Sequence, residues 1–169
     1  MAVLLAACAA PPSYHPPPQK VLPQGPEPLR ERPLLHMSDP DLDYFIGGGM
    51  FPFSQGSWRW THRNPEFRIY LADPRRRELR MRFAVIDSTF RRTGPVTVTP
   101  SVNHTPLAPR RYEGPGEYEY RCPVPGSSLK EHAPAIVGLG ITPVFVGERD
   151  GTVLGVYLRS IGLPREGAP

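Results

Sequence analysis

The chain has 169 residues, a formal net charge of +4, 24 prolines and only two cysteines. This length suits one domain of ordinary size, and two cysteines exclude the disulfide framework of a small secreted scaffold. The positive charge is modest and scattered, so we do not expect nucleic acid as a partner, although other anionic partners remain compatible with it.

Residues 1–8 form a short apolar stretch that ends in Leu5-Ala6-Ala7-Cys8. This stretch resembles the lipobox of bacterial lipoproteins, in which the signal peptidase cleaves before a cysteine that then carries lipid. It lacks a basic residue and is shorter than the usual apolar segment of about 7 to 15 residues, which we attribute to a start site set too far downstream. The resemblance implies lipidation of Cys8 and a lipid-anchored place in the bacterial cell envelope, periplasmic or on the outer surface. The alternative is an alanine-rich leader with a chance cysteine.

Residues 9–42 are rich in proline and poor in large apolar side chains, since ten prolines lie between Pro11 and Pro40. This composition predicts a disordered linker. At its end the acidic residues Asp39, Asp41 and Asp43 alternate, and oxygen ligands suit Ca²⁺. The central glycine and distal glutamate of an EF-hand are missing, and the histidines are scattered, so we expect no metal and no cofactor.

Residues 43–163 show the alternation that is typical of half-buried strands. Apolar residues occupy every second position in Glu66–Leu71 and in Leu79–Val85. The stretches Ala135–Ile141 and Val144–Val146 are more uniformly apolar, which predicts interior strands. The pattern predicts an all-β fold, an antiparallel jelly-roll-like β-sandwich of about eight strands, followed by a flexible tail over 164–169.

Short turn signals separate the predicted strands. Asp150-Gly151 predicts a hairpin turn, and Asn103-His104 predicts a second one. Pro100 lacks an N–H group, which places its strand at an edge or a bulge. The single helical turn that we expect is Ser127–His132, where Ser128 and Glu131 have the spacing of a capping box.

The two tryptophans, Trp58 and Trp60, share one face of a strand, and Arg59 lies on the other face. Exposed, the two indoles would form a stacking surface for sugar rings. Buried, they would belong to the core, and this is the interpretation that we favour. In the alternative, a sugar-binding set combines Trp58, Arg59 and Trp60 with Tyr112 and Tyr157.

Two further patterns concern a cysteine and a row of charges. Cys122 lies in an aromatic strand, which predicts a buried and inert thiol. Arg68, Arg80 and Arg82 alternate with apolar residues, as do Glu117 and Glu119. If these strands are neighbours, the charges can pair across the sheet.

Taken in order, the short motifs of residues 48–163 resemble a group of poorly characterised bacterial β-sandwich surface modules of galactose-binding-like, jelly-roll character. The motifs are Trp58-Arg59-Trp60-Thr61, Pro65-Glu66-Phe67-Arg68, Thr93-Gly94-Pro95-Val96, Ser101-Val102-Asn103, Tyr112 with Pro115-Gly116, Pro123-Val124-Pro125 with Leu129, and Leu154-Gly155 with Ile161-Gly162-Leu163. The resemblance implies a non-catalytic role in binding glycan or in assembling envelope components. His104, where glycine is more usual in that group, departs from the pattern.

The chain carries no nucleophile elbow, no activated cysteine motif and no phosphate-binding loop. We therefore expect no enzyme but a membrane-anchored module that binds glycan or an envelope protein. One alternative is a structural or assembly subunit that acts through a strand edge or an arginine-rich face. A second alternative is an unrecognised enzyme.

Overall fold

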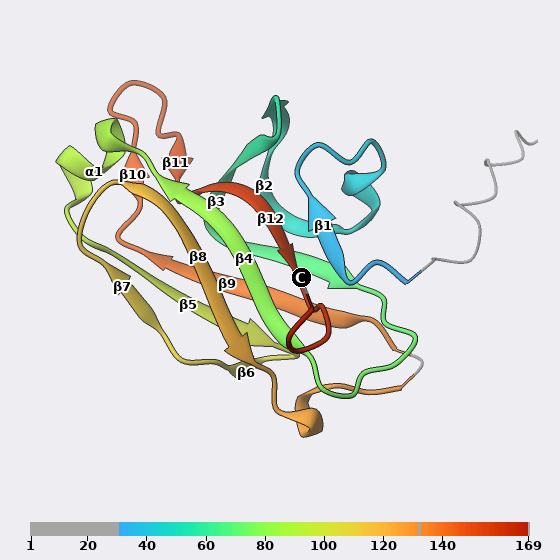
Figure 1. The fold of residues 1–169 in the computed structure, drawn as a ribbon. Coiled ribbons are helices and arrows are strands. Elements are labelled where there is room, and N and C mark those ends of the chain that lie inside the picture. The colour runs from blue at the N-terminus through green and yellow to red at the C-terminus, as the bar shows by residue number, and fades with distance from the viewer. Residues whose placement is uncertain (1–30, 132, 169) are drawn as a thin grey trace, which may run out of the picture.

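The computed structural model describes residues 31–131 and 133–168 (Figure 1). Cys8, the lipobox and residues 9–30 of the predicted linker lie outside the described residues. The elements, in chain order, are β1 (Leu34–His36), η1 (Leu42–Tyr44), β2 (Ile46–Gln55), β3 (Trp58–Ile69), β4 (Glu78–Val85), α1 (Asp87–Thr93), β5 (Val96–Val102), β6 (Thr105–Pro106), β7 (Arg110–Tyr112), β8 (Gly116–Pro123), η2 (Gly126–Ser128), β9 (Ala135–Thr142), β10 (Phe145–Val146), β11 (Val153–Leu154) and β12 (Tyr157–Gly162).

The strands form an antiparallel β-sandwich, as the sequence predicts. The hydrogen-bonded order is β6-β5-β9-β3-β12-β4-β8, with β1 beside β12, β2 beside β3 and β7 beside β5. In Figure 1 the strands β12, β4 and β8 cross in front of β5 and β9. Strand β3 joins the two layers, because Glu66 to Ile69 pair with β9 whereas Arg59 and Trp60 pair with β12.

The core lies between these layers and follows the alternation of the sequence. Phe67 and Ile69 on β3 and Met81 and Phe83 on β4 have no exposed surface. They meet the apolar side chains of β5 and β9, whose burial alternates along each strand. The period-two pattern therefore identified the inner face of these strands correctly.

Residues 34–42 differ from the predicted linker, because they are packed on the sandwich. Strand β1 pairs with β12, and Leu35, Met37 and Leu42 are at most 1% exposed. The prediction for residues 9–42 was based on their high proline content and did not consider these three apolar residues. Burial of their side chains offsets the conformational entropy lost when the segment is ordered.

The helical content also differs from the prediction. The α-helix is Asp87–Thr93, directly after β4, whereas the predicted turn at Ser127–His132 holds only the short 3-10 helix Gly126–Ser128, without a side-chain cap. A helix of two turns is too short to show a clear 3.6-residue periodicity. It ends at Gly94, whose φ of 70° closes the last turn.

Both predicted hairpin turns are confirmed. Asn103 and His104 have φ angles of 46° and 66°, and Gly151 has a φ of 66° between β10 and β11. However, Val144–Val146 is not an interior strand, since β10 and β11 form a separate small hairpin and Val146 is 52% exposed.

Pro100 occupies a strand with neighbours on both sides, not an edge. Strand β5 pairs with β9 along one side and with β7 and β6 along the other. The carbonyl of Pro100 accepts a hydrogen bond from Leu107, in the gap between β6 and β7. Since N and C=O of one strand residue point the same way, the missing N–H faces this gap and no ladder bond is lost.

Candidate functional site

The N-terminal half of β3 turns its two tryptophans away from the interior. Arg59 and Thr61 are buried, whereas Trp58 and Trp60 are only half-buried. The Thr61 hydroxyl donates to the carbonyl of Val156 at 3.1 Å and accepts from its N–H at 2.9 Å. These bonds fix the inner face of β3, so alternation places both indoles on the outer face.

The structure thus corrects the interpretation of Trp58 and Trp60 as core residues. The interior at this end of β3 is too tight for an indole, because Gly155 approaches the strand closely. A Cβ atom on Gly155 would lie 2.6 Å from the Thr61 Oγ1 atom and 2.5 Å from the carbonyl oxygen of His62. The guanidinium of Arg59 instead reaches the edge of the sandwich, where it pairs with Asp43 at 2.6 Å.

Tyr157 joins the two tryptophans from the neighbouring strand β12. Its backbone pairs with Trp60 on one side and with Ala84 of β4 on the other. Its ring stacks on Trp58, with centroids 5.3 Å apart and planes 12° apart, and lies 4.9 Å from the ring of Trp60. We call Trp58, Trp60 and Tyr157 the aromatic platform.

A groove of about 520 Å³ runs along the platform, and we call it the aromatic groove. It is lined by Trp58, Ala84, Val85, Ile86, Asp87, Pro115, Gly116, Glu117 and Tyr157. The lining thus combines the rings of Trp58 and Tyr157 with the end of β4, the start of α1 and the start of β8. Asp87 also pairs with Arg91 at 2.8 Å. The groove therefore combines apolar ring surface with two carboxylates that can accept hydrogen bonds.

Of the predicted ligand-binding residues, the structure brings together Trp58, Trp60 and Tyr157 but not Arg59 or Tyr112. Arg59 is buried beneath β3, on the opposite face from the indoles. Tyr112 is 5% exposed and packs edge-on against Phe83, and burial raises its pKa. Sequence spacing could not separate these residues, since it does not show which strands become neighbours.

The residues of α1 and β8 that line the groove are not predicted as site residues from the sequence. Asp87 follows directly after β4, and Pro115 with Gly116 precedes β8. Strands β4 and β8 pair along their full length, from Glu78 with Pro123 to Val85 with Gly116. This pairing brings the two segments together beside Tyr157, and although Pro115-Gly116 is a recognisable turn motif, nothing local in the sequence links it to Asp87 or Tyr157.

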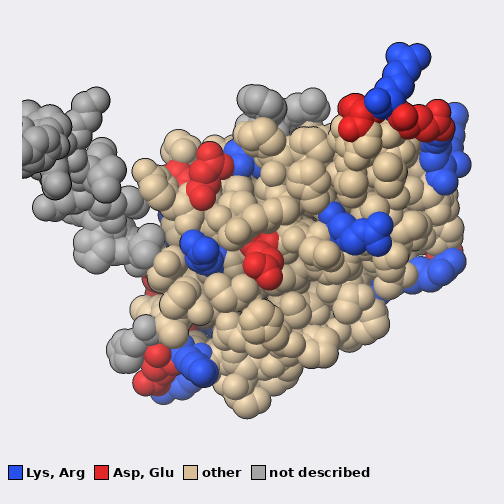
Figure 2. Space-filling model, turned by 180° about the vertical axis from the view of Figure 1, so that it is seen from behind, with Lys and Arg blue, Asp and Glu red and all other residues tan. Residues whose placement is uncertain are grey.

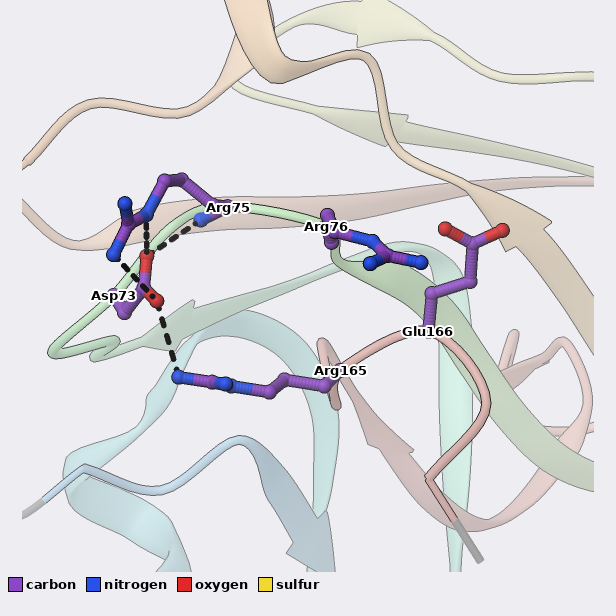
Figure 3. A pocket seen from close by; sticks show the side chains of 5 residues that line it. All are labelled: Asp73, Arg75, Arg76, Arg165 and Glu166. Carbon is purple, nitrogen blue, oxygen red and sulfur yellow. Dashed lines mark hydrogen bonds and ion pairs between the residues drawn. The ribbon is translucent and has the colours of Figure 1, made fainter.

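A second cavity, of about 490 Å³, lies at the loop before β4 (Figure 3). Asp73 accepts a hydrogen bond from the Arg75 Nε atom at 2.9 Å and forms an ion pair with Arg165 at 3.0 Å. The side-chain hydrogen bond from Arg75 contributes most to lowering the pKa of Asp73, to about 2. The Asp73 carboxylate is therefore already paired with two arginines. Because one of them, Arg165, belongs to the C-terminal segment, the ion pair holds that segment against the loop.

The acidic residues that alternate at the start of the domain are engaged in structural contacts. Asp41 pairs with Arg32 at 2.6 Å, Asp39 accepts a hydrogen bond from the backbone N–H of His36, and Asp43 pairs with Arg59. Within residues 31–131 and 133–168, no group of three or more His, Cys, Asp or Glu side chains is placed to hold a metal ion.

Other predicted features have mixed outcomes. The thiol of Cys122 is half-buried and not fully buried. Arg82 and Glu119 do lie opposite each other on β4 and β8, but Arg68 lies on β3, opposite Ile136 of β9. In the described part of the chain, no helix is long and apolar enough to cross a membrane.

The opposite side of the molecule offers no comparable aromatic cluster among its described strands. The outward positions of β5 and β9 carry small or uncharged residues such as Thr97, Thr99, Gly138 and Gly140. Figure 2 shows this side, where a broad uncharged surface bears a few separate charges and most charges lie toward its margins.

Comparison with known proteins gave structural matches only. No family model matches the chain, and no curated protein matches it. One similar structure is the CBM36-1 domain of a multidomain xylanase from the hindgut metagenome of Trinervitermes trinervoides, with 12% identity, a TM-score of 0.45 and coverage of 80% of this chain and 98% of that chain. Another is a carbohydrate-binding module CBM36 in complex with calcium and xylotriose, with 14% identity, a TM-score of 0.43 and coverage of 78% and 98%.

Proposed function

We propose that the β-sandwich is a non-catalytic module that binds a glycan in the aromatic groove. The stacked, half-exposed pair of Trp58 and Tyr157 is the observation that carries this proposal. The C–H faces of sugar rings are apolar and pack on aromatic rings, while sugar hydroxyls donate hydrogen bonds to nearby acceptors. Asp87 and Glu117 supply such acceptors beside the rings.

The geometry of the platform fits this task better than a purely structural role. An aromatic residue that only fills space normally has no exposed surface, and Phe83 has none. Trp58 and Tyr157 are instead only half-buried and line an open groove, although Tyr157 and Arg159 both pack against the Trp58 ring. Rigid aromatic side chains lose little conformational entropy on binding, which makes them effective contact residues.

The test is binding to an array of oligosaccharides, followed by calorimetry with the strongest ligand. We expect Trp58→Ala to weaken binding by about 1–2 kcal/mol, which is roughly a five- to thirty-fold change in Kd. The matched control is Tyr44→Ala, because Tyr44 is an aromatic residue outside the groove that is 62% exposed. If the protein binds no member of the array, or if both variants bind as tightly as the wild type, the proposal is wrong.

We further propose that the module is held in the bacterial cell envelope by lipid on Cys8. The lipobox-like Leu5-Ala6-Ala7-Cys8 supports this, and the proline-rich residues that follow suit a spacer between a membrane surface and a binding domain. Labelled palmitate should be incorporated by the full chain expressed in a bacterium with a complete upstream signal. The label should disappear in Cys8→Ser, and an unlabelled parent protein would exclude the anchor.

A further inference from the structure

A second groove crosses the outer face of the same sheet, and arginines dominate it. Its volume is about 350 Å³. We call it the basic groove, and it is lined by Leu34, His36, Arg80, Arg82, Glu119, Arg121, Arg159 and Ser160. Four guanidinium groups thus face one carboxylate, which makes the groove a place where an anion is favoured.

The register of the sheet explains why these arginines converge. Arg82 of β4 lies opposite Glu119 of β8 and opposite Ser160 of β12, and Arg80 lies opposite Arg121. The pairing of β12 with β4 shifts between Leu158 and Ser160. Arg159 shares the outer face with Tyr157 by ordinary alternation, and the irregularity brings Ser160 to the same face, so that both residues line the groove.

The arginines of the basic groove differ in how far they are already neutralised. Arg80 is buried and pairs with Glu78 at 2.7 Å, and its guanidinium also donates to the carbonyl of Ala168. Arg121 pairs with Glu119 at 3.0 Å. Arg82 and Arg159 are exposed, and neither forms an ion pair with a carboxylate of the described residues. Two accessible guanidinium groups are therefore available to a ligand.

Arg159 connects the basic groove to the aromatic groove. Its guanidinium carbon lies 5.5 Å from the ring centroid of Trp58, and Trp58 lines the aromatic groove. The two grooves therefore meet where the Arg159 guanidinium contacts the indole of Trp58. Asp87 and Glu117 also line the aromatic groove and would repel an anion there. A ligand that lies across both grooves needs a neutral ring at one end and a negative charge at the other.

Building on the proposed function, we infer that the glycan is acidic. A neutral sugar ring packs on Trp58 and Tyr157, and an adjoining sugar presents its carboxylate or sulfate to Arg82 and Arg159. Guanidinium groups bind such anions through paired hydrogen bonds, which are stronger than bonds between neutral groups.

The test uses an array that holds neutral, uronate-bearing and sulfated oligosaccharides, with the intact chain as probe. We expect the bound members to be acidic, and the tighter of the uronate-bearing and sulfated classes identifies the anion. The strongest ligand is then compared with its carboxyl-reduced or desulfated form. We expect removal of the anion, and likewise Arg82→Gln, to weaken binding about tenfold, the usual scale for one charged hydrogen bond. Arg149→Gln removes an exposed arginine near the β10–β11 turn and should leave Kd unchanged.

The outcomes separate this inference from the proposed function. If neutral oligosaccharides bind as well as acidic ones, and binding depends on Trp58 but not on Arg82, the module binds glycan and the acidic specificity is wrong. If no oligosaccharide binds, both proposals fail. Tighter binding of polyglutamate than of any acidic oligosaccharide would overturn the glycan assignment in favour of an acidic protein partner. Arg159→Gln gives an independent second variant, and thermal melting confirms that each variant is folded.

Discussion

Gly155 packs so closely against β3, the strand that carries Trp58 and Trp60, that no space is left for a side chain at position 155. Its N–H donates to the Thr61 carbonyl at 2.7 Å, and it precedes Val156, which bonds to the Thr61 hydroxyl. In Gly155→Ala the new Cβ atom would lie 2.5 Å from the His62 carbonyl oxygen, whereas ordinary contact begins near 3.4 Å. The segment must therefore move by about 0.9 Å, the difference between these two distances.

A displacement of this size has a calculable effect on stability. It would stretch the 2.7 Å and 2.9 Å bonds beyond hydrogen-bonding range, and each such bond contributes about 0.5–1.5 kcal/mol. Overpacking strain adds about 1–3 kcal/mol. We expect a total loss of about 2–6 kcal/mol in the free energy of unfolding, which lowers Tm by roughly 6–18 °C at about 3 °C per kcal/mol for a chain of this size.

Thermal and urea unfolding followed by circular dichroism measure this change. The matched control is Gly126→Ala, because Gly126 has no atom within 4 Å of an added Cβ and no positive φ. We expect this control to stay within about 0.5 kcal/mol of the wild type. A Gly155→Ala protein as stable as the control would refute the close approach between β3 and the segment before β12.

Two predictions concern groups with shifted pKa values. Arg75 lowers the pKa of Asp73 to about 2 from 3.8, so the stability from this pairing is present above pH 3.8 and is lost as pH falls through 2. NMR titration should place the Asp73 midpoint near 2 and, in Arg75→Gln, closer to 3.8; a wild-type midpoint of 3.8 would contradict the pairing. Burial raises the pKa of Tyr120, whose hydroxyl donates to the Ala108 carbonyl at 2.8 Å, so stability should fall as pH rises past the unfolded value of 10.0. Tyr120→Phe should lose about 1 kcal/mol at neutral pH and part of this alkaline dependence, and unfolding curves that match the wild type at both pH values would exclude it.

Local patterns in the sequence were sufficient to predict the inner faces of several strands and two of the turns. Alternation identified the inner residues of β3 and β4, such as Phe67 and Phe83, because a strand exposes its two faces in turn. Asp150-Gly151 identified a turn, because glycine accepts a positive φ. These features depend on residues a few positions apart, so they can be predicted without knowledge of the partner strands.

The order of the strands and the composition of the grooves depend on contacts between distant segments. The sequence favours the core for Trp58 and Trp60 because a sandwich needs large side chains in its interior. The interior position instead belongs to Thr61, which bonds to Val156, 95 residues later in the chain. The same pairings bring Tyr157 to the tryptophans and Arg82 to Arg159, while they bury Arg59 and Tyr112. The sequence determined that each strand has an inner and an outer face. Tertiary pairing decided which face of β3 is the outer one and which side chains gather there, because register and strand order are set by packing across the whole chain.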